Sequence, residues 1–381
     1  MNDDKNIEAS RNLPSGGRGA RIIIAGGGTG GHIFPAIAIA NAIKKLEPKT
    51  EILFVGAKGK MEMEKVPQAG YRIEGLGIAG FNRSSLIKNI GLPFKLVRSF
   101  LQVDRIFNSF RPDAVIGVGG YSSFPVLRYA QSKNIPSFIH ESNSFAGKSN
   151  KMLGKKAKKI FVASEGMEKF FPAAKIMITG NPVRKSISNS TISREEGIRF
   201  FGLDPTKKTV LSIGGSLGAK SINAALEKGL DEFEKNDLQL IWQTGKPFAK
   251  TASERAVDKP NIWVDDFIAQ MEFAYAAADL VISRSGAMAI AELCVEKKPV
   301  VFVPYPFAAE DHQSVNAQNL VNKTAGIMIK DDEALDKLVP TIIGLSKDEQ
   351  KQNELKTNIG RLAVTNADEI IANEILMAIA A

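Results

Sequence analysis

Two short glycine-rich clusters are the segments of this chain best suited to chemistry. The cluster Gly26–Gly31 (GGGTGG) follows an apolar run at Arg21–Ala25, and Gly214–Gly218 (GGSLG) follows a similar run at Thr209–Ile213. Loops of glycine allow backbone N–H groups to approach a phosphate at the start of a helix. The sequence therefore predicts two strand–loop–helix units that can bind phosphate. The alternative for each is a tight turn that binds no ligand.

The first cluster does not by itself indicate a nicotinamide cofactor. It matches the pattern G-x-G-x-x-G at Gly26, Gly28 and Gly31, but a dinucleotide site also needs an acidic residue after the second strand to hold the ribose. That strand ends in Val55–Gly59, and the next carboxylate is Glu62. Neither cluster ends in Gly-Lys-Ser/Thr, so a P-loop is excluded as well.

His32 follows the first cluster directly, where a helix over Phe34–Leu46 is predicted to begin. It is one of three histidines in the chain. An imidazole gains and loses a proton near neutral pH, so His32 is a candidate general base or substrate hydrogen-bonding group. The alternative is that it caps the helix or packs locally.

The second half contains another loop and helix with candidate binding groups. The loop Arg284–Ala287 follows a predicted strand, and the first turn of the helix that runs on to Lys297 presents N–H groups to an anion. Glu292 lies inside this helix, where its carboxylate could accept both hydroxyls of a ribose. The alternative is a solvated helix glutamate.

A polar helix follows, with Asp311 as its predicted N-cap. Gln313 and Asn316 are three residues apart and share a face, so their amides are suited to sugar hydroxyls. For His312 we favour ordinary surface exposure.

These candidate residues require two layered domains to position them. Short apolar strands alternate with helices in both halves of the chain, which is typical of parallel sheets covered on both faces. Two such halves predict two Rossmann-like domains. Besides the runs before the glycine clusters, the predicted strands are Ile52–Val55, Ala114–Val118, Ser137–Ile139, Ile160–Ala163, Lys175–Thr179, Leu238–Gln243, Ile262–Val264, Leu280–Ser283, Val300–Val303 and Ile327–Lys330.

The predicted division places a disordered leader at 1–20 and an N-terminal domain at 21–183. A C-terminal domain follows at 184–364, with Lys185–Arg194 as a polar, Ser-rich linker. An apolar helix over Asp368–Ile379, within the segment 365–381, is expected to pack back onto the first domain.

Composition narrows the classes of partner. The 381 residues carry 50 Lys and Arg against 41 Asp and Glu, a formal charge of +9, which favours anionic partners or serves solubility alone. The single cysteine, Cys294, excludes an internal disulfide and fits a reducing compartment. The chain has no apolar run as long as a membrane span, so any membrane contact is expected to be peripheral.

The motifs taken together resemble the bacterial glycosyltransferase family that adds N-acetylglucosamine to lipid I, the undecaprenyl-pyrophosphoryl-N-acetylmuramyl-pentapeptide of peptidoglycan synthesis. The motifs occur in the family's order from about residue 20 to the C-terminus. They are GGGTGGHIFPAIAIA from Gly26, GGYSSFP from Gly119, HESN from His140, GNPVR from Gly180, GGSLGA from Gly214, DFI from Asp266, SRSGAMAIAE from Ser283, FVPYP from Phe302 and DHQSVNA from Asp311.

The resemblance implies the GT-B fold, two Rossmann-like domains facing across a cleft, with UDP-N-acetylglucosamine bound mainly by the C-terminal domain. It assigns Ile268 to the uracil, Ser216 to the pyrophosphate, Glu292 to the ribose and Gln313 to the sugar. It assigns acceptor binding and catalysis to His32, Tyr121 and Glu141. The remaining donor-site residues that it implies are Thr29, Gly30, Gly31, Asn143, Arg184, Ala287, Met288, Ala289, Ile290 and Ala291.

Four positions depart from the family's pattern. Ser142 and Ser314 stand where glutamine is common, Phe124 where glycine is common, and His312 where arginine is frequent. These departures put details of the acceptor mouth and of one sugar contact in doubt, and they leave the donor residues intact.

The resemblance also implies a mechanism and a location. The α-linked donor and the β-linked product make the reaction inverting, with His32 as the first choice of base and Glu141 as the second. The chain lacks Asp-x-Asp, and the helix after Arg284–Ala287 can stabilise the leaving UDP, so no metal or other cofactor is expected. The expected partners are UDP-N-acetylglucosamine, lipid I and the anionic cytoplasmic face of the inner membrane, with no nucleic acid.

The segment Gly77–Gln102 is the predicted membrane contact. It interleaves apolar residues with Arg83, Lys88, Lys95 and Arg98 and contains no acid, which is typical of an interfacial surface. The alternative is a helix packed in the core with solvated lysines.

Two other functions remain open from the sequence. One is a non-catalytic nucleotide-binding module, and the other is a sugar-nucleotide epimerase of the same architecture that needs no lipid acceptor. Release of UDP only in the presence of a lipid acceptor would exclude both.

Overall fold

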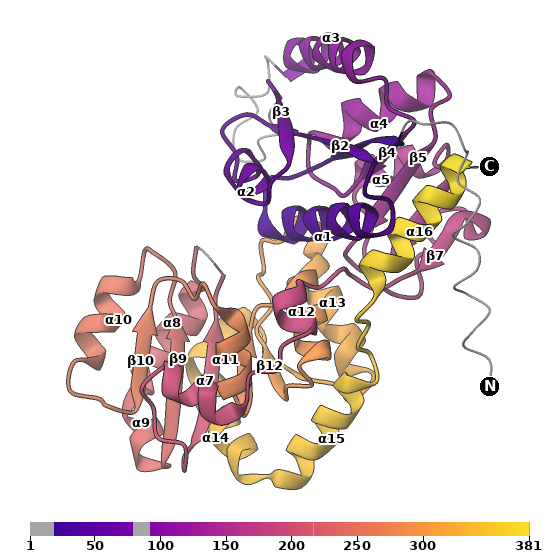
Figure 1. The fold of residues 1–381 in the computed structure, drawn as a ribbon. Helices are drawn as coiled ribbons and strands as arrows, with labels where there is room; N and C mark the ends of the chain where they lie inside the picture. Colours follow the sequence, from indigo (N-terminus) through magenta and orange to yellow (C-terminus); the bar gives the residue numbers. More distant parts are fainter. Residues whose placement is uncertain (1–18, 79–91, 216, 381) are drawn as a thin grey trace. The chain divides into compact units, whose positions relative to one another are not determined.

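The structure is a computed structural model that describes residues 19–78, 92–215 and 217–380. The predicted leader therefore lies almost entirely outside the described residues, as do Ser216, Arg83 and Lys88. The chain divides into two compact units, residues 1–183 with 366–381 and residues 184–365 (Figure 1).

Within the described residues, the first unit contains a seven-stranded sheet in the order β3-β2-β1-β4-β5-β6-β7, and every pairing is parallel. Parallel strands need crossover helices, and these cover both faces of the sheet. The strands are β1 (Arg21–Ala25), β2 (Glu51–Ala57), β3 (Arg72–Leu76), β4 (Ala114–Gly117), β5 (Ser137–Glu141), β6 (Lys159–Val162) and β7 (Ile176–Ile178). The helices are α1 (Gly30–Leu46), α2 (Glu62–Gln68), α3 (Leu92–Phe110), α4 (Ser123–Ser132), α5 (Lys148–Gly154), the short turn η3 (Ala173–Lys175) and α16 (Ala367–Ala380).

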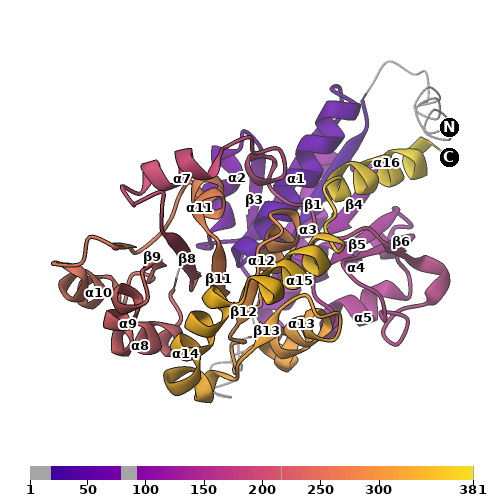
Figure 2. The same ribbon diagram turned by 90° about the horizontal axis from the view of Figure 1, so that it is seen from below.

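Two apolar layers hold the first unit together. One layer joins α1 and α16 to the sheet, and Ile22, Ile39 and Ile371 are among its fully buried members. The other contains Ile23 and Val115 from the sheet and Val103 of α3. Alternate residues of β1 thus enter opposite layers, which explains its continuous apolar run. The C-terminal helix α16, predicted over Asp368–Ile379, packs against α1 and completes one of these layers (Figures 1 and 2).

The second unit repeats the arrangement. Its described residues form a six-stranded parallel sheet in the order β10-β9-β8-β11-β12-β13. The strands are β8 (Lys208–Ile213), β9 (Leu238–Gln243), β10 (Ile262–Asp265), β11 (Leu280–Ser283), β12 (Val300–Phe302) and β13 (Ile327–Met328). The helices are α6 (Lys185–Ser188), α7 (Arg194–Phe200), α8 (Lys220–Lys228), α9 (Leu230–Lys235), α10 (Ala249–Ala256), α11 (Met271–Ala277), α12 (Ala287–Val295), α13 (His312–Val321), α14 (Ala334–Lys347) and α15 (Glu349–Gly360), with short turns η4 (Ala309–Asp311) and η5 (Asp331–Glu333).

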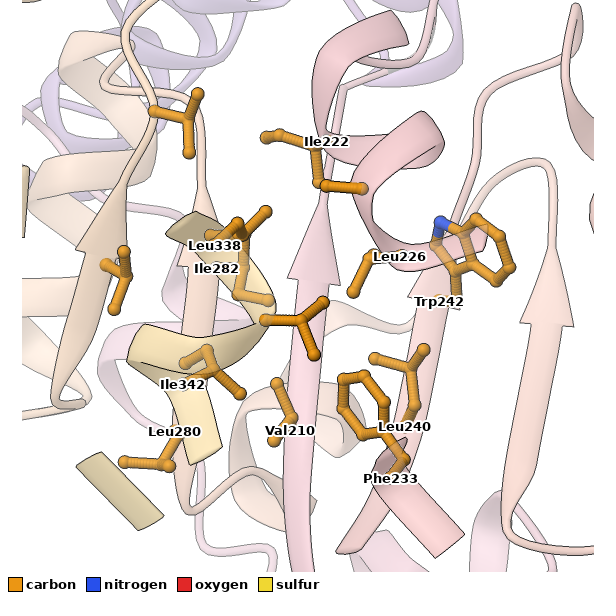
Figure 3. Close-up of a cluster of buried hydrophobic side chains, with 14 of the residues drawn as sticks. Val210, Ile222, Leu226, Phe233, Leu240, Trp242, Leu280, Ile282, Leu338 and Ile342 are labelled. Atoms are coloured by element: carbon orange, nitrogen blue, oxygen red, sulfur yellow. The ribbon is translucent and has the colours of Figure 1, made fainter. Parts of the chain in front are cut away.

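The core of the second unit lies between its sheet and the helices α8, α9 and α14 (Figure 3). Val210 and Ile282 from the sheet meet Leu226 and Leu338 from the helices, and all four are fully buried. Each such aliphatic side chain contributes roughly 1.5–3 kcal/mol by burial.

The predicted alternation of strands and helices is confirmed in both units, with two differences. Strand β3 was not predicted, because its side chains alternate between half-buried and exposed and include Arg72 and Glu74. The predicted linker Lys185–Arg194 is partly helical: α6 contacts α11 and α12, and Ser193 with Glu196 forms a capping box at the start of α7. No helix within the described ranges has the length and apolar character needed to cross a membrane.

Candidate functional site

Both sheets reverse their strand order next to a glycine loop. In open parallel sheets, ligands bind at the carboxyl ends of the strands where the order reverses. In the first unit that point lies between β1 and β4, where Gly26–Gly28 and Gly119–Gly120 meet. The N–H of Gly27 donates to the carbonyl of Gly119 at 3.2 Å. A β-carbon on Gly120 would come within 2.4 Å of the Gly27 carbonyl oxygen, so the contact of the two loops requires glycine.

The first glycine loop uses its own N–H groups internally. Gly26 donates to the Val55 carbonyl at 3.1 Å, and Gly28 donates to Oε2 of Glu62 at 2.8 Å. The Glu62 carboxylate thus lies where a phosphate would be expected to bind Gly28. The next N–H groups along the chain are those of the first turn of α1. Gly30 and Gly31 begin this helix after the exposed Thr29, which occupies the N-cap position.

His32 is the third residue of α1, so it lies at the start of a helix, as predicted. Its Nδ1 lies 3.0 Å from the carbonyl oxygen of Gly27 and 3.5 Å from Thr29 Oγ1. The ring also lies against Gly119, because a β-carbon there would approach Nε2 to 2.7 Å. His32 therefore packs locally through Nδ1 and is held by both loops of the strand-order reversal.

Glu141 ends β5 and organises the loop that follows it. Its side chain is buried, with 5% exposed. Oε1 accepts from the Asn143 backbone and side-chain amides at 3.2 and 3.4 Å, and Oε2 accepts from Gly147 N at 3.3 Å and Asn150 Nδ2 at 2.8 Å. Both carboxylate oxygens of Glu141 are thus engaged by donors of the loop that follows β5. Glu141 is therefore the group that orients Asn143 and holds this loop in place.

The acceptor-side candidates occupy the loop after β4 and the start of α4. Tyr121 is 58% exposed, which leaves its ring accessible to a ligand. Phe124, where the family often has glycine, packs against the apolar layer of α3 and α4. Ser142, a second departure from the family's pattern, directly follows β5; it is buried, and its carbonyl accepts a hydrogen bond from Asn181 Nδ2 at 3.0 Å. These two departures therefore contribute to packing within the unit.

His140 precedes Glu141 on β5 and lies entirely within the first unit's interior. Burial lowers the pKa of His140 to about 4, and the backbone of Gly180 and the side chain of Asn181 oppose this shift. The folded unit therefore holds the ring neutral, whereas the unfolded chain titrates near the ordinary value of 6.5.

This burial predicts a specific pH dependence of stability. Between pH 6.5 and 4 the unfolded chain binds a proton at His140 that the folded chain does not, so stability present above pH 6.5 is lost on acidification. The loss attributable to His140 is expected to reach about 3 kcal/mol. Urea denaturation across this range should show a shallower loss for His140→Phe than for the wild type. Parallel curves for the two proteins would contradict the assignment.

In the second unit the equivalent reversal lies between β8 and β11, at the glycine loop that follows β8. Gly215 has a φ of +76°, and apart from its chain neighbours no atom of the described residues lies within 4 Å of where a β-carbon would lie. Gly218 packs directly on the loop after β9, because a β-carbon on it would meet the Thr244 carbonyl oxygen at 2.1 Å. Ser216, the predicted pyrophosphate contact, lies outside the described residues.

The loop Arg284–Gly286 between β11 and α12 is fixed from three sides. The Arg284 guanidinium donates to the Val303 and Pro304 carbonyls at 2.9 and 3.0 Å and pairs with Asp331 at 2.5 Å. Ser285 is fully buried, and its Oγ donates to the Gln313 carbonyl at 2.8 Å. This loop places the N-terminus of α12 at the same edge of the sheet as the glycine loop Gly214–Gly218.

Helix α12 presents a partly accessible apolar surface and one buried carboxylate. Its residues Ala287, Met288, Ala289, Ile290 and Ala291 are half-buried. Glu292 is not the solvated glutamate of the alternative interpretation: it is 7% exposed and accepts from Arg184 at 2.8 Å and from the Tyr275 hydroxyl at 3.0 Å. Burial raises the pKa of Glu292, while Arg184 and Tyr275 oppose that shift. Burial, reinforced by the charge of Glu292, also raises the pKa of Tyr275 well above its ordinary value.

Two other predicted donor contacts, Ile268 and Gln313, follow β10 and β12 at the same edge of this sheet. Ile268 is buried in the loop after β10, so its backbone is held in place by its side chain. Gln313 is half-buried, and its Oε1 accepts from the Tyr305 N–H at 3.0 Å. Asn316 is buried and donates to the Ser285 carbonyl at 3.2 Å, so it supports the loop, although it shares a helix with Gln313.

The start of α13 differs from the prediction in detail. Asp311 occupies the N-cap position, but its side chain does not cap the helix. It accepts a hydrogen bond from Ser314 Oγ at 2.7 Å instead. Asp311 and Glu310 both adopt left-handed backbone conformations, with φ of 52° and 56°, and this tight turn redirects the carboxylate. His312 is half-buried, less exposed than the surface residue that was favoured.

Sequence reasoning missed several supporting residues. Glu62 contacts the first glycine loop from α2, and Tyr275 contacts Glu292 from α11. In α8, Asn223 is buried and bridges the Trp242 indole N–H and the Thr244 carbonyl, at 3.0 and 2.8 Å (Figure 3 shows Trp242). A polar residue on an otherwise apolar helix face was the available signal for Asn223.

Comparisons with known proteins agree with this arrangement. Residues 22–162 match the glycosyltransferase family 28 N-terminal domain, and residues 209–372 match the glycosyltransferase family 28 C-terminal domain. A relative from Phocaeicola vulgatus is 53% identical over 93% of this chain and 95% of its own length. It is named UDP-N-acetylglucosamine–N-acetylmuramyl-(pentapeptide) pyrophosphoryl-undecaprenol N-acetylglucosamine transferase.

Solved structures give the same grouping. The crystal structure of Acinetobacter baumannii MurG superposes with a TM-score of 0.75 at 28% identity, covering 94% of this chain and 99% of that one. A UDP-GlcNAc 2-epimerase from Neisseria meningitidis reaches a TM-score of 0.66 at 12% identity, covering 94% of this chain and 100% of that one, which shows a shared fold alone. The chain therefore belongs to glycosyltransferase family 28 and, within it, to the family of UDP-N-acetylglucosamine–N-acetylmuramyl-(pentapeptide) pyrophosphoryl-undecaprenol N-acetylglucosamine transferases, the MurG family.

Proposed function

We propose that this enzyme transfers N-acetylglucosamine from UDP-N-acetylglucosamine to the C4 hydroxyl of the N-acetylmuramyl group of lipid I, giving lipid II with inversion at the anomeric carbon. The 53% identity with the Phocaeicola vulgatus transferase over nearly the whole of both chains carries this proposal. The two glycine loops, each at a strand-order reversal, supply the two binding edges that such a reaction needs.

The proposed donor site lies in the second unit. The loop at Gly215 and the N-terminus of α12 face the diphosphate, Ile268 meets the uracil, and Gln313 contacts the sugar. Glu292, whose Oε1 pairs with Arg184 and whose Oε2 accepts from Tyr275, accepts the ribose hydroxyls through its remaining lone pairs. Support comes from the burial of Glu292 and from the half-buried surface of α12 that precedes it.

The proposed reaction is a single displacement. The acceptor hydroxyl oxygen forms a bond to the anomeric carbon as the bond to the UDP phosphate oxygen breaks. His32 Nε2 takes the hydroxyl proton, and UDP leaves with the electron pair of the broken bond. Tyr121, exposed beside this loop, contacts the acceptor.

A UDP-release assay tests the activity. UDP should appear from UDP-N-acetylglucosamine only when a soluble lipid I analogue is present, and the analogue should gain one N-acetylglucosamine by mass spectrometry. Conversion of the donor without an acceptor would indicate an epimerase, and binding without any release would indicate a non-catalytic module. Either outcome would reject the proposed activity.

We also propose that the transfer needs no metal or other cofactor, because the N-terminus of α12 and backbone amides can stabilise the leaving diphosphate. Turnover of the soluble analogue should be unchanged by a chelator. If the chelator abolishes turnover and Mg²⁺ restores it, the amide-based account is wrong.

A docking surface for the anionic, cytoplasmic face of the inner membrane is proposed on α3. One face of this helix is buried through Val103 and Phe107, whereas Phe94, Val97 and Leu101 are 80, 63 and 60% exposed. Their spacing of three and four residues places them on one stripe, with the exposed Arg98 among them. Apolar and basic side chains presented together favour an anionic lipid surface. Arg83 and Lys88 of the predicted segment lie outside the described residues, as does the side chain of Lys95.

Replacing Phe94, Val97 and Leu101 with glutamine is expected to weaken sedimentation with phosphatidylglycerol-containing vesicles about tenfold or more, since each buried apolar side chain contributes roughly 1.5–3 kcal/mol. Glutamine preserves helix propensity, so activity on a soluble acceptor should survive. A matched control replaces Val257 and Leu335, which are 74% and 47% exposed in the second unit, and should leave sedimentation unchanged. Equal vesicle binding by the α3 variant and the wild type would place the docking surface elsewhere.

A further inference from the structure

Glu62 is a buried carboxylate to which neither the proposed chemistry nor the family motifs give a role. It is the first residue of α2, and only 1% of its surface is exposed. Oε1 accepts from the Ala57 N–H at 2.9 Å, and Oε2 accepts from the Gly28 N–H at 2.8 Å. The carboxylate also lies on the backbone of Gly27, where a β-carbon would meet Oε1 at 2.4 Å. Glu62 is thus fitted to the first glycine loop.

One peptide group connects this carboxylate to His32. The N–H of Gly28 and the carbonyl of Gly27 belong to the same peptide unit, at its opposite ends. Glu62 accepts from that N–H at 2.8 Å, and the carbonyl oxygen lies 3.0 Å from His32 Nδ1. Carboxylate, peptide and imidazole therefore form a continuous chain of hydrogen bonds, and such chains polarise their members.

The donor and acceptor at each step of these hydrogen bonds determine the tautomer of the His32 ring. A carbonyl oxygen only accepts, so the bond requires the hydrogen to be on Nδ1 of His32. Nε2 then carries the lone pair. A negative charge at the far end of the peptide makes the Gly27 carbonyl a stronger acceptor and favours this tautomer, which is the one a base acting through Nε2 needs.

We propose that Glu62 is a positioning residue for glycosyl transfer: acting through the Gly27–Gly28 peptide, it holds His32 in the Nδ1–H tautomer with Nε2 free to take the proton of the acceptor hydroxyl. This inference rests on the proposed function for the role of Nε2. When Nε2 is protonated, the Nδ1–H bond to Gly27 remains, and the Glu62 charge stabilises the imidazolium through the intervening peptide.

The first test reads the ring directly. In the full-length wild-type protein, ¹⁵N NMR of the imidazole groups should show His32 in the Nδ1–H form at pH 8, assigned by its loss in His32→Asn among the three histidines. Glu62→Gln removes the charge and one of two acceptors, and it should give a mixture of tautomers. A predominant Nε2–H form in the wild type, or an unchanged signal in Glu62→Gln, would overturn the proposal.

The second test is a double-mutant cycle on turnover. Glu62→Gln should lower kcat about tenfold or more, as part of the hundredfold or greater factor that general-base assistance supplies. KM for UDP-N-acetylglucosamine should change less than about twofold, and the acid limb of the pH profile of kcat should move to lower pH. In a His32→Ala background, Glu62→Gln should add almost nothing, because both changes remove the same function.

Asp113 provides a matched control. Its carboxylate accepts the Arg21 N–H at 2.7 Å at the opposite end of β1, and Asp113→Asn should leave both the ring tautomer and the pH profile unchanged. An equal fall of kcat caused by Glu62→Gln with and without His32 would overturn the inference and make Glu62 a structural residue only. Full turnover by His32→Ala would instead reject His32 as the base of the proposed function. The effect of Glu62 on the ring would then be judged from the NMR tautomer signal of His32 by itself.

Discussion

Replacement of His32 by asparagine should lower kcat on a soluble lipid I analogue about a hundredfold to ten-thousandfold, the range that general-base assistance supplies. The asparagine amide can still donate to the Gly27 carbonyl, as Nδ1 does at 3.0 Å, so the loop is expected to keep its shape. No group remains at the position of Nε2. Turnover, measured by UDP release, should therefore fall, whereas UDP affinity, measured by calorimetry, should stay nearly unchanged.

UDP affinity is expected to change less than about twofold in His32→Asn, since the proposed nucleotide contacts lie in the second unit. His32→Ala, which also removes the bond to Gly27, should be at least as impaired as His32→Asn. Full activity in His32→Asn would show that the ring serves only to support the loop. Equal losses of UDP affinity and turnover would likewise make His32 a structural residue.

The second large effect is expected at Glu292. Glu292→Ala should weaken UDP binding about fivefold to 150-fold, equivalent to about 1–3 kcal/mol, because the ribose hydroxyls lose their acceptor. The same change leaves the Arg184 guanidinium and the buried Tyr275 hydroxyl without the partner that they have at 2.8 and 3.0 Å. The thermal unfolding temperature should therefore fall as well.

Two further variants separate binding from folding. Tyr275→Phe removes only the hydroxyl, so it should lower stability by about 1 kcal/mol and leave UDP affinity within about twofold of the wild type. Glu292→Gln keeps the side-chain volume but loses the charge that Arg184 faces, and it should impair UDP binding. Unchanged calorimetric affinity in both Glu292 variants would reject the ribose contact, whatever their stability.

Most strands, and the glycine loops that follow two of them, are identified by patterns that are local in sequence. Arg21–Ala25, Leu238–Gln243 and Leu280–Ser283 are short apolar runs next to turn residues, and they are strands because both faces of each are buried. The two glycine clusters come immediately after runs of this kind in the sequence. The start of α1 was predicted only approximately: the predicted helix begins at Phe34, whereas α1 begins at Gly30, so the last two glycines of the cluster lie in its first turn.

The strand that sequence reasoning missed shows the limit of those patterns. Among the described residues, strand β3 pairs only with β2, at the edge of its sheet, and Arg72 and Glu74 on it alternate with less exposed residues. An edge strand buries one face, so its apolar signal is weak over five residues. Its assignment depends on pairing with β2, which a local pattern does not contain.

Tertiary structure alone decided which polar groups meet. Glu62 is 34 residues from Gly28, and Glu292 is 108 residues from Arg184. From the sequence, Glu62 was noted only as the next carboxylate after the second strand, and Glu292 could equally have been a solvated glutamate. The chain encodes the type of each residue and the elements that carry it. Which carboxylate occupies a glycine loop and which one faces an arginine depends on how the helices pack on their sheets, because hydrogen bonds form only between groups that packing brings within about 3 Å.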